Sequence, residues 1–293
     1  MRYELIDDKK KKKPNETLEE KIYQQIKKAK LSPVEAKKVL KNFQQISPKK
    51  YHTKKIEFSD KHVKFCVFGD MHMGHQDYRP DILRKMVKDA KRQDVEFYLN
   101  AGDTIEGMSG REGHIYELTH IGATQQLNYF ASEFKRFHKP VYSIEAQDSH
   151  GGWFRNKGNT GLEIGPELER RSKHYEFLGY DEQDLKLDNG LKIRLRHPGG
   201  GTAYAISYKI QKYIESIGGG DKPNMLFEGH FHKAEYLFYR NIHGYDVGTL
   251  QNQSPFMKKT NTPAHVGYWI VDVYTDKKKG VERVINQFVP FYD

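Results

Sequence analysis

Cysteine is almost missing from this chain. Among 293 residues, Cys66 is the single cysteine, so the sequence excludes an intramolecular disulfide and a zinc site built from cysteine thiolates. Long apolar runs are missing as well, since no stretch approaches the roughly 18 consecutive apolar residues that a membrane helix needs. The first residues contain five consecutive lysines, Lys9–Lys13, without the apolar core of a secretory signal. We therefore expect a soluble, cytoplasmic protein with no membrane partner.

Hydrophobic residues are also scarce. They make up 37% of the chain, against roughly 45–50% in an average globular protein. Aromatic residues, at 13%, nevertheless argue against a disordered chain, because solvated chains contain few of them. A chain of 293 residues is long enough to bury a sizeable core. It fits two domains of roughly 150 residues, or one large α/β domain with an appendage.

Charge is unevenly distributed along the chain. The net charge of +10 comes from 49 basic and 39 acidic residues, and residues 1–60 contain 17 of the basic and 9 of the acidic ones. The remaining residues are close to neutral, with 32 basic and 30 acidic side chains. A basic N-terminal arm is expected where a protein contacts nucleic acid or another polyanion. The alternative is that these lysines only keep a tail solvated.

The sequence divides into regions of different character. We expect a disordered basic tail at residues 1–14, a helical extension at 15–55 and the main domain at 62–293. In the extension, Thr17 with Glu20 fits one helix start, and Ser32, Pro33 and Glu35 fit a second. The helix pair either packs against the main domain or forms a helix-turn-helix reader, although the pattern lacks the third helix of such a reader.

From residue 62 onwards, strand and helix patterns alternate. Apolar runs of strand length occur at Val63–Phe68, Val95–Leu99 and Val141–Ile144, and helical periodicity occurs at 81–92 and 116–138. Buried strands separated by helices are typical of βαβ units, which form parallel sheets. Beyond about residue 184, strand patterns dominate, at 191–195, 225–227, 236–239, 245–250, 266–273 and 281–289. The sequence therefore predicts an α/β domain.

Residue types that bind metals follow four of the apolar runs. They are Asp70 and His72, Asp103 and Glu106, His197, and finally His230 and His232. In an open α/β sheet, ligands bind beyond the carboxyl ends of the strands, so these side chains are expected to converge. Mixed histidine and carboxylate ligands suit Mn²⁺, Fe or Zn²⁺ better than Ca²⁺. An aspartate between two ions about 3.5–4 Å apart would form a two-metal phosphoester site.

The order of these motifs resembles that of the calcineurin-like metallophosphoesterase superfamily. Asp-x-His, Gly-Asp-x-x-Glu and Gly-His-x-His occur in this order within residues 62–290, and His197–Lys233 and Ala264–Gly267 are similar to phage and prophage members. The resemblance implies a four-layer α/β/β/α sandwich with two central mixed sheets, to which the small N-terminal helical extension is added. It also implies the host cytoplasm as the location if the chain is phage-encoded.

The same resemblance implies a set of ligands for two divalent metal ions. Asp70, His72 and His232 would hold the first ion, Asp103 would bridge, and the second would be held by His197, His230 and Gln147. A hydroxide that bridges the ions would attack phosphorus in line. Mn²⁺ is the expected metal, with Mg²⁺, Fe and Zn²⁺ as alternatives. The implied activity is hydrolysis of a phosphoester.

One motif departs from the family pattern. The family has Gly-Asn-His and then an acidic residue, whereas this chain continues after its strand with Glu145-Ala146-Gln147-Asp148-Ser149-His150. Gln147 falls on the asparagine that ligates the second metal, and Asp148 falls on the catalytic histidine. Nearby cations should depress the pKa of Asp148 and make it a poor acid. His150 could supply the missing imidazole, as could His75 or His114. Asp148 and His150 are therefore the candidate catalytic residues.

Three functions remain open at this point. The first is a phosphodiesterase or nuclease on DNA or RNA, which the basic arm and the phage-like resemblance favour. Trp153, Phe154 and Arg155 follow the altered motif, and the aromatics either stack on a base or pack under a loop. The second is a phosphomonoesterase on a small molecule or phosphoprotein, because a fold does not fix its substrate. The third is a catalytically impaired module that binds nucleic acid or a partner protein, which the altered motif favours.

A glycine triplet, Gly199–Gly201, follows His197 and precedes a helix expected from Tyr204. It lacks the Lys-Ser/Thr pair of a phosphate-binding P-loop, so binding of a nucleoside triphosphate is not expected. We expect the triplet to let the backbone pass close to the metal centre.

Overall fold

The computed structural model describes residues 53–156, 161–276 and 280–292, together with Lys28, Ser32 and Glu35. The chain divides into two compact units, residues 1–50 and residues 51–293. The predicted basic tail at 1–14 lies outside the described residues, as does most of the predicted helical extension.

The three described residues of the first unit confirm one predicted helix start. Lys28 and Glu35 are helical. The Ser32 backbone N–H donates to Glu35 Oε2 at 2.9 Å, and the Glu35 backbone N–H donates to Ser32 Oγ at 3.3 Å. This reciprocal pair is a capping box, which satisfies two backbone donors at the start of a helix.

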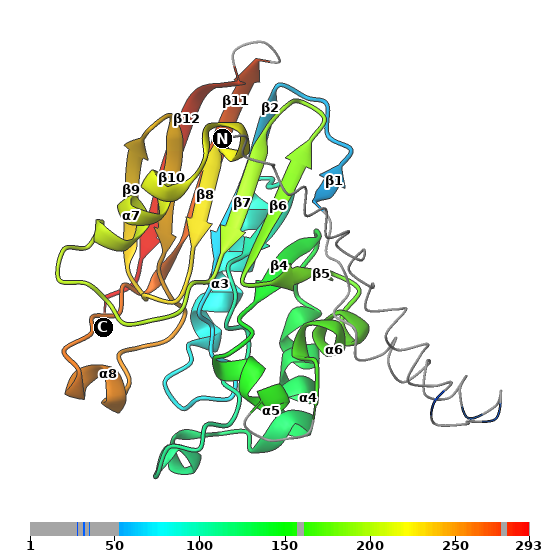
Figure 1. The fold of residues 1–293 in the computed structure, drawn as a ribbon, viewed down its shortest axis with the longest axis vertical. Helices are drawn as coiled ribbons and strands as arrows, with labels where there is room; N and C mark the ends of the chain where they lie inside the picture. The colour runs from blue at the N-terminus through cyan, green and yellow to red at the C-terminus, as the bar shows by residue number, and fades with distance from the viewer. Residues whose placement is uncertain are drawn as a thin grey trace, which may run out of the picture. The chain divides into compact units, whose positions relative to one another are not determined.

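Two six-stranded sheets form the second unit (Figure 1). The first sheet has the order β1 (Lys54–Ile56), β6 (Glu182–Leu187), β7 (Lys192–Arg196), β8 (Met225–Glu228), β10 (Ile242–Val247) and β9 (Ala234–Tyr239). The second sheet has the order β12 (Gly280–Pro290), β11 (Gly267–Asp276), β2 (His62–Phe68), β3 (Phe97–Asn100), β4 (Val141–Glu145) and β5 (Tyr175–Tyr180).

Both sheets are mixed, with a parallel part at the centre. In the second sheet, β2, β3, β4 and β5 run parallel, and β11 pairs antiparallel with β2. In the first sheet, β7, β8 and β10 run parallel. Parallel strands end at the same edge of a sheet, so the loops after β2 and β3, and those after β7 and β8, are neighbours.

The two sheets pack face to face through their inner side chains. Phe65 of β2 and Leu99 of β3 belong to the same buried cluster as Leu195 of β7 and Phe227 of β8. The opposite face of the second sheet packs in another cluster against three helices, α3 (Pro80–Arg92), α4 (Gly122–Phe134) and α6 (Ile164–Arg171). This alternation follows from the two-residue period of a strand.

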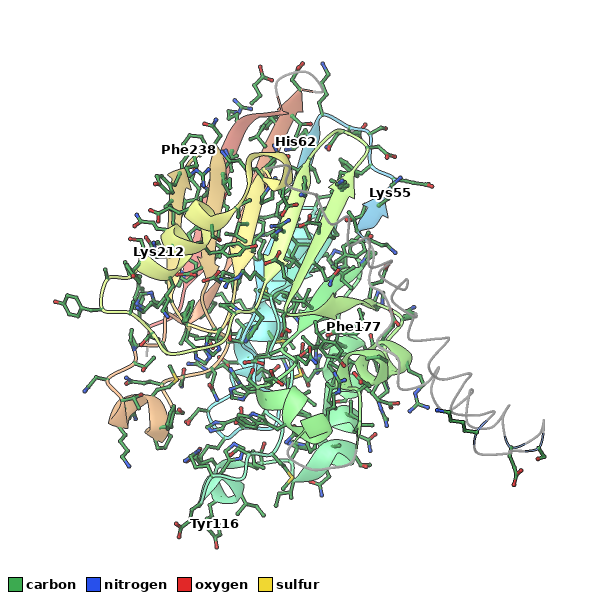
Figure 2. The ribbon with its side chains drawn as sticks, viewed as in Figure 1. Lys55, His62, Tyr116, Phe177, Lys212 and Phe238 are labelled. Carbon is green, nitrogen blue, oxygen red and sulfur yellow. The ribbon has the colours of Figure 1, made fainter. Side chains whose placement is uncertain are left out.

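The outer face of the first sheet is covered by α7 (Tyr208–Ser216). Ile210 and Ile214 pack against Leu226 and Ile242 of the sheet, while Lys212 lies on the solvent side of the helix (Figure 2). The order of layers is therefore α/β/β/α, and the predicted fold class is confirmed.

Short helical turns occupy the connections around this sandwich. They are the 3-10 turns η1 (His114–Glu117), η2 (His150–Gly152) and η3 (Gly219–Asp221), and the helices α5 (Trp153–Asn156) and α8 (Pro255–Lys259). Within the part of the chain that the structure describes, every helix is too short or too polar to cross a bilayer.

Some predicted boundaries were wrong. The helix expected over 116–138 is η1 followed by α4, because Ile121 is extended and Gly122 has a left-handed φ of 81°. The helix expected from Tyr204 begins at Tyr208, after a turn in which the Tyr208 N–H donates to Ala205 O at 3.2 Å. The end of the predicted helical extension is strand β1, which pairs parallel with β6 at the sheet edge.

Candidate metal centre

Most of the predicted metal ligands lie past the ends of β2, β3, β7 and β8. Backbone hydrogen bonds join the first two loops, from Asp70 N–H to Gly102 O at 3.0 Å and from His72 N–H to Asp103 O at 3.0 Å. The His230 N–H donates to both carboxylate oxygens of Asp70 at 2.9 Å. The last contact links the two sheets, because Asp70 follows the second sheet and His230 follows the first.

Left-handed backbone is concentrated at this site. The φ angles are 48° at Asp70, 54° at His72, 48° at Asp103, 44° at His150, 80° at His230 and 55° at His232. This conformation is unfavourable for a residue that has a Cβ, and such strain gathers at functional sites. The left-handed residues bend the chain just past β2, β3 and β8, which turns the following side chains toward one centre.

The first group of candidate ligands is Asp70, His72 and His232. The Nε2 atoms of the two histidines lie 3.0 Å apart, and Asp70 Oδ1 lies 3.4 Å from His232 Nε2. His72 Nδ1 lies 3.0 Å from Glu106 Oε2. Because a carboxylate only accepts, Nδ1 carries the proton and Nε2 keeps a lone pair. Burial, with the charge of His150, lowers the pKa of His72 to about 4, so its ring is neutral at pH 7.

The second group is Asp103, His197 and His230. Asp103 Oδ2 lies 3.0 Å from His197 Nε2, yet both of these buried atoms lack a hydrogen-bond partner. His197 Nδ1 donates to Ala101 O at 2.7 Å, and His230 Nε2 donates to Gly200 O at 2.7 Å. Each ring is therefore oriented through one nitrogen, which leaves the other nitrogen for a ligand.

These atoms fit a divalent metal ion. Burial lowers the pKa of His197, but the facing Asp103 carboxylate raises it to about 10. A positive charge, from a proton or a cation, is thus favoured between the two side chains. Within each group, the candidate ligand atoms lie within 4.8 Å of one another. Imidazole nitrogens combined with carboxylate oxygens suit Mn²⁺, Fe and Zn²⁺.

The glycine triplet passes beside the second group, as predicted. Gly200 has a left-handed φ of 90°, and its carbonyl oxygen is the acceptor for His230. Glycine adopts this φ without the strain that other residues incur. The triplet therefore helps to orient a candidate ligand.

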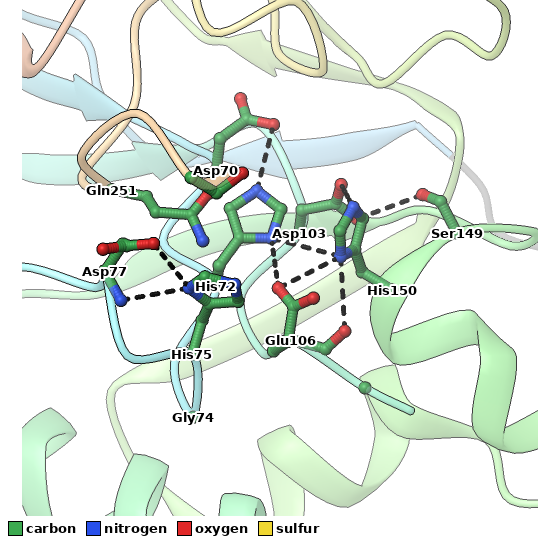
Figure 3. A network of polar contacts seen from close by, with 12 residues as sticks. Asp70, His72, Gly74, His75, Asp77, Asp103, Glu106, Ser149, His150 and Gln251 are labelled. Carbon is green, nitrogen blue, oxygen red and sulfur yellow. Dashed lines mark hydrogen bonds and ion pairs between the residues drawn. The ribbon is translucent and has the colours of Figure 1, made fainter. Parts of the chain in front are cut away.

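Glu106 contacts three imidazole rings, and Figure 3 shows two of them, His72 and His150. Its Oε2 lies 3.0 Å from His72 Nδ1 and 3.3 Å from His150 Nδ1, and its Oε1 lies 2.7 Å from His114 Nε2. Burial raises the pKa of Glu106, but His150 and the hydrogen bonds outweigh it, so the pKa lies well below the usual range. Glu106 is therefore an ionised carboxylate. Its place in the motif could be read from the sequence, but its contacts with His114 and His150 could not.

The loop after β4 brings His150, not Asp148, close to the candidate ligands His72 and Asp103. Asp148 is exposed and belongs to none of the three groups found among the described residues. His150 forms the third group with His72 and Asp103, and its Nε2 lies 3.7 Å from Asp103 Oδ2. Burial lowers the pKa of His150, but Asp103 and Glu106 raise it to about 9.

Gln147 uses its backbone N–H to donate to Asp181 Oδ1 at 2.9 Å. This bond anchors the start of the loop to the residue that follows β5. The role of the Gln147 side chain as a metal ligand stays a prediction, and so does the catalytic role of Asp148.

The other two candidate histidines have a partner at each ring nitrogen. His75 Nδ1 accepts from Asp77 N–H at 3.0 Å, and His75 Nε2 lies 3.4 Å from Glu117 Oε2. His114 Nδ1 accepts from Ser109 N–H at 3.2 Å, and its Nε2 lies 2.7 Å from Glu106 Oε1. These contacts favour His150 as the source of the imidazole.

Two aromatic residues follow η2, and one lies in the core while the other lies beside the candidate site. Phe154 is buried in the cluster under the second sheet, so the loop-packing alternative is confirmed for this residue. The Trp153 ring lies against His150, with centroids 4.5 Å apart. Arg155 pairs with Glu163 at 3.2 Å. Trp153 therefore flanks a candidate site residue.

Comparison with curated proteins finds distant relatives of the chain. No family model matches the chain. It is similar to the DNA polymerase II small subunit of Halobacterium salinarum, with 22% identity over 241 residues, which cover 69% of this chain and 46% of that protein. The chain thus spans about half the length of the curated relatives it matches.

Solved structures that resemble the chain include phosphoesterases. An archaeal phosphodiesterase shares 12% identity, with 78% of this chain and 100% of that chain covered and a TM-score of 0.43. Vps29 of Entamoeba histolytica, solved with zinc, shares 14% identity, with 78% and 100% covered and a TM-score of 0.38.

Proposed function

We propose that this chain is a metal-dependent phosphoesterase with a two-ion centre. The observation that carries the proposal is the position of Asp103. This buried carboxylate shares one candidate group with His197 and His230 and another with His72, which also belongs to the first group, and its Oδ2 has no hydrogen-bond partner. A carboxylate shared between two ion positions is the arrangement that two-metal phosphoester hydrolysis needs.

The chain offers ligands on both sides of Asp103. Asp70, His72 and His232 would hold one ion, and His197 and His230 would hold the other. Divalent ions bound there would activate water and stabilise the charge that develops on a phosphoryl group. The role of the protein is to fix the ligands in advance. Glu106 orients His72, and the carbonyls of Ala101 and Gly200 orient the two histidines of the second group.

His150 is the proposed proton donor to the leaving group. Its Nδ1 lies 3.2 Å from the Glu106 carbonyl oxygen and 3.3 Å from Glu106 Oε2. This arrangement leaves Nε2, on the side of Asp103, for a substrate oxygen. A positioned acid of this kind speeds a reaction by about 10²–10⁴-fold. His150 thus takes the role that the motif order assigns to Asp148.

The proposed substrates are phosphodiester bonds of DNA or RNA. Residues 1–60 contain 17 basic and 9 acidic residues, and such a surplus attracts the phosphate backbone. The name of the curated relative, a DNA polymerase subunit, points in the same direction. Mn²⁺ stays the expected metal, and the similarity to phage members stays a prediction.

A second candidate is a binding module with little activity. The altered third motif, with Gln147 and Asp148 where the family has asparagine and histidine, favours it. The grouping of Asp70, His72, Asp103, His197, His230 and His232 argues against it, because a module that needs no metal has no reason to keep this set.

Hydrolysis of bis(p-nitrophenyl) phosphate tests the proposal. With Mn²⁺, the wild type should cleave this diester, and His230→Ala or removal of metal by EDTA should abolish cleavage. Faster cleavage of p-nitrophenyl phosphate would indicate a phosphomonoesterase instead. Labelled DNA and RNA oligonucleotides would then define the substrate. If the wild type is inactive with Mn²⁺, Mg²⁺, Fe²⁺ and Zn²⁺, the binding module becomes the better account.

A further inference from the structure

The turn after β4 contacts the buried carboxylate at the middle of the candidate site. Its first residue, Ser149, donates its hydroxyl hydrogen to Asp103 Oδ1 at 3.2 Å (Figure 3). The turn closes through a hydrogen bond from Gly152 N–H to Ser149 O at 2.8 Å. Family motifs in the sequence point to the neighbouring Gln147 and Asp148, and not to Ser149.

Glycines fix the position of this turn. A Cβ on Gly107, which has a φ of 76°, would lie 1.9 Å from His150 O. A Cβ on Gly152 would lie 2.3 Å from Gln147 O. Both distances are far too short for real atoms, so these backbone contacts require glycine. The turn therefore rests directly on the segment after β3, which also carries Asp103.

The two oxygens of Asp103 have different surroundings. Oδ1 accepts the Ser149 hydroxyl. Oδ2 is buried without a hydrogen-bond partner, 3.0 Å from His197 Nε2 and 3.7 Å from His150 Nε2. A carboxylate held through one oxygen presents the other in a fixed direction. Hydrogen bonds to a ligand residue tune metal sites in this way.

We propose that Ser149 is a positioning residue of the metal centre. Its hydroxyl holds Oδ1 of Asp103, so that Oδ2 faces the positions of the ions. The inference rests on the proposed two-ion centre. It gives the third motif a contact with this centre at Ser149, two residues beyond Gln147.

Calorimetric titration of Mn²⁺ into the metal-free chain tests the inference without a need for activity. Ser149→Ala should weaken Mn²⁺ binding by about 10–100-fold, the usual effect of losing a group that orients a ligand. Ser132→Ala, a control at an exposed serine of α4 whose hydroxyl donates to Tyr129 O at 2.7 Å, should bind Mn²⁺ like the wild type. Thermal unfolding of the metal-free variants should be unchanged, since the Ser149 side chain is partly exposed.

A second pair of variants separates the hydroxyl from the shape of the side chain. Ser149→Thr and Ser149→Val have nearly the same shape and differ in the hydroxyl group, so the threonine variant should bind Mn²⁺ more tightly. Equal affinities in this pair, or an unchanged affinity in Ser149→Ala, would overturn the assignment. Failure of the wild type to bind Mn²⁺ would overturn the two-ion centre itself, which distinguishes the two failures.

Discussion

Two parts of the candidate site reach the same centre by different routes. Asp70, Asp103 and His230 come just past the ends of β2, β3 and β8, where a left-handed residue bends the chain inward. His150 comes after β4 and a further turn, and that turn is held by its contact with Gly107. The sheet itself places the first three residues, whereas packing against another loop places the fourth.

This difference shows which motifs can be read residue by residue. At a strand end, the order of residues decides which side chain enters the site, because the register of the strand is fixed by its neighbours. Past a turn, two extra residues can shift the position that enters the site. In this chain the shift runs from Asp148 to His150.

The largest effect is expected at His150, the residue that is placed by packing against another loop. His150→Gln should lower kcat by about 10²–10⁴-fold, because the leaving oxygen loses its proton donor. Asp148→Asn, the matched change at the aligned position, should alter kcat little. Steady-state hydrolysis of bis(p-nitrophenyl) phosphate with Mn²⁺ measures both.

If Asp148→Asn lowered kcat more than His150→Gln, the proton donor would be the residue at the family's motif position. The proposal that the turn brings His150 into that role would then be contradicted. Loss of a bound ion in His150→Gln would also contradict it, since His150 would then be a ligand and not a proton donor.

A smaller effect is expected at Glu106, the carboxylate that contacts both His72 after β2 and His150 after β4. Glu106→Gln removes the charge that orients His72 and His150, and should lower metal affinity or activity by about 10–100-fold. Glu112→Gln, at an exposed position in the connection that follows Glu106, is the control. Mn²⁺ titration and kcat/KM report the two consequences. Equal values for both variants would mean that Glu106 has no orienting role.

A comparable effect, on stability and not on activity, is expected from the glycine that contacts the turn. Gly107→Ala places a Cβ against the His150 carbonyl and at a φ of 76°, which should cost about 1–3 kcal/mol of unfolding free energy. Gly110→Ala has open space around its Cβ and should stay within about 0.5 kcal/mol of the wild type. Denaturant unfolding measures the difference. Equal stabilities would show that the turn does not depend on this contact.

Most of the ligand groups could be predicted from the sequence. Strand ends of a parallel sheet share an edge, so apolar runs followed by aspartate or histidine suffice to bring Asp70, Asp103 and His230 together. The contact of Ser149 with Asp103 and the contacts of Glu106 with three histidines could not be predicted, because they depend on how separate loops pack. No local pattern marks a glycine that lies against a backbone from another loop.

The fold shows the same limit. The central strands β2 and β4 were predicted close to their bounds, because both of their faces are buried and their runs are apolar. The edge strand β1 was assigned to the helical extension, since its three residues KKI resemble any short polar segment. Strand β6 has charged side chains at alternate positions, so a search for apolar runs did not find it.

The central claim is that Asp103 is shared by two metal ions. Elemental analysis of Mn²⁺ bound per chain, after loading and removal of free metal, tests it most directly. The wild type should retain two ions, and Asp103→Asn should lose this two-ion occupancy because the shared carboxylate is gone. Two ions retained in Asp103→Asn would contradict the account.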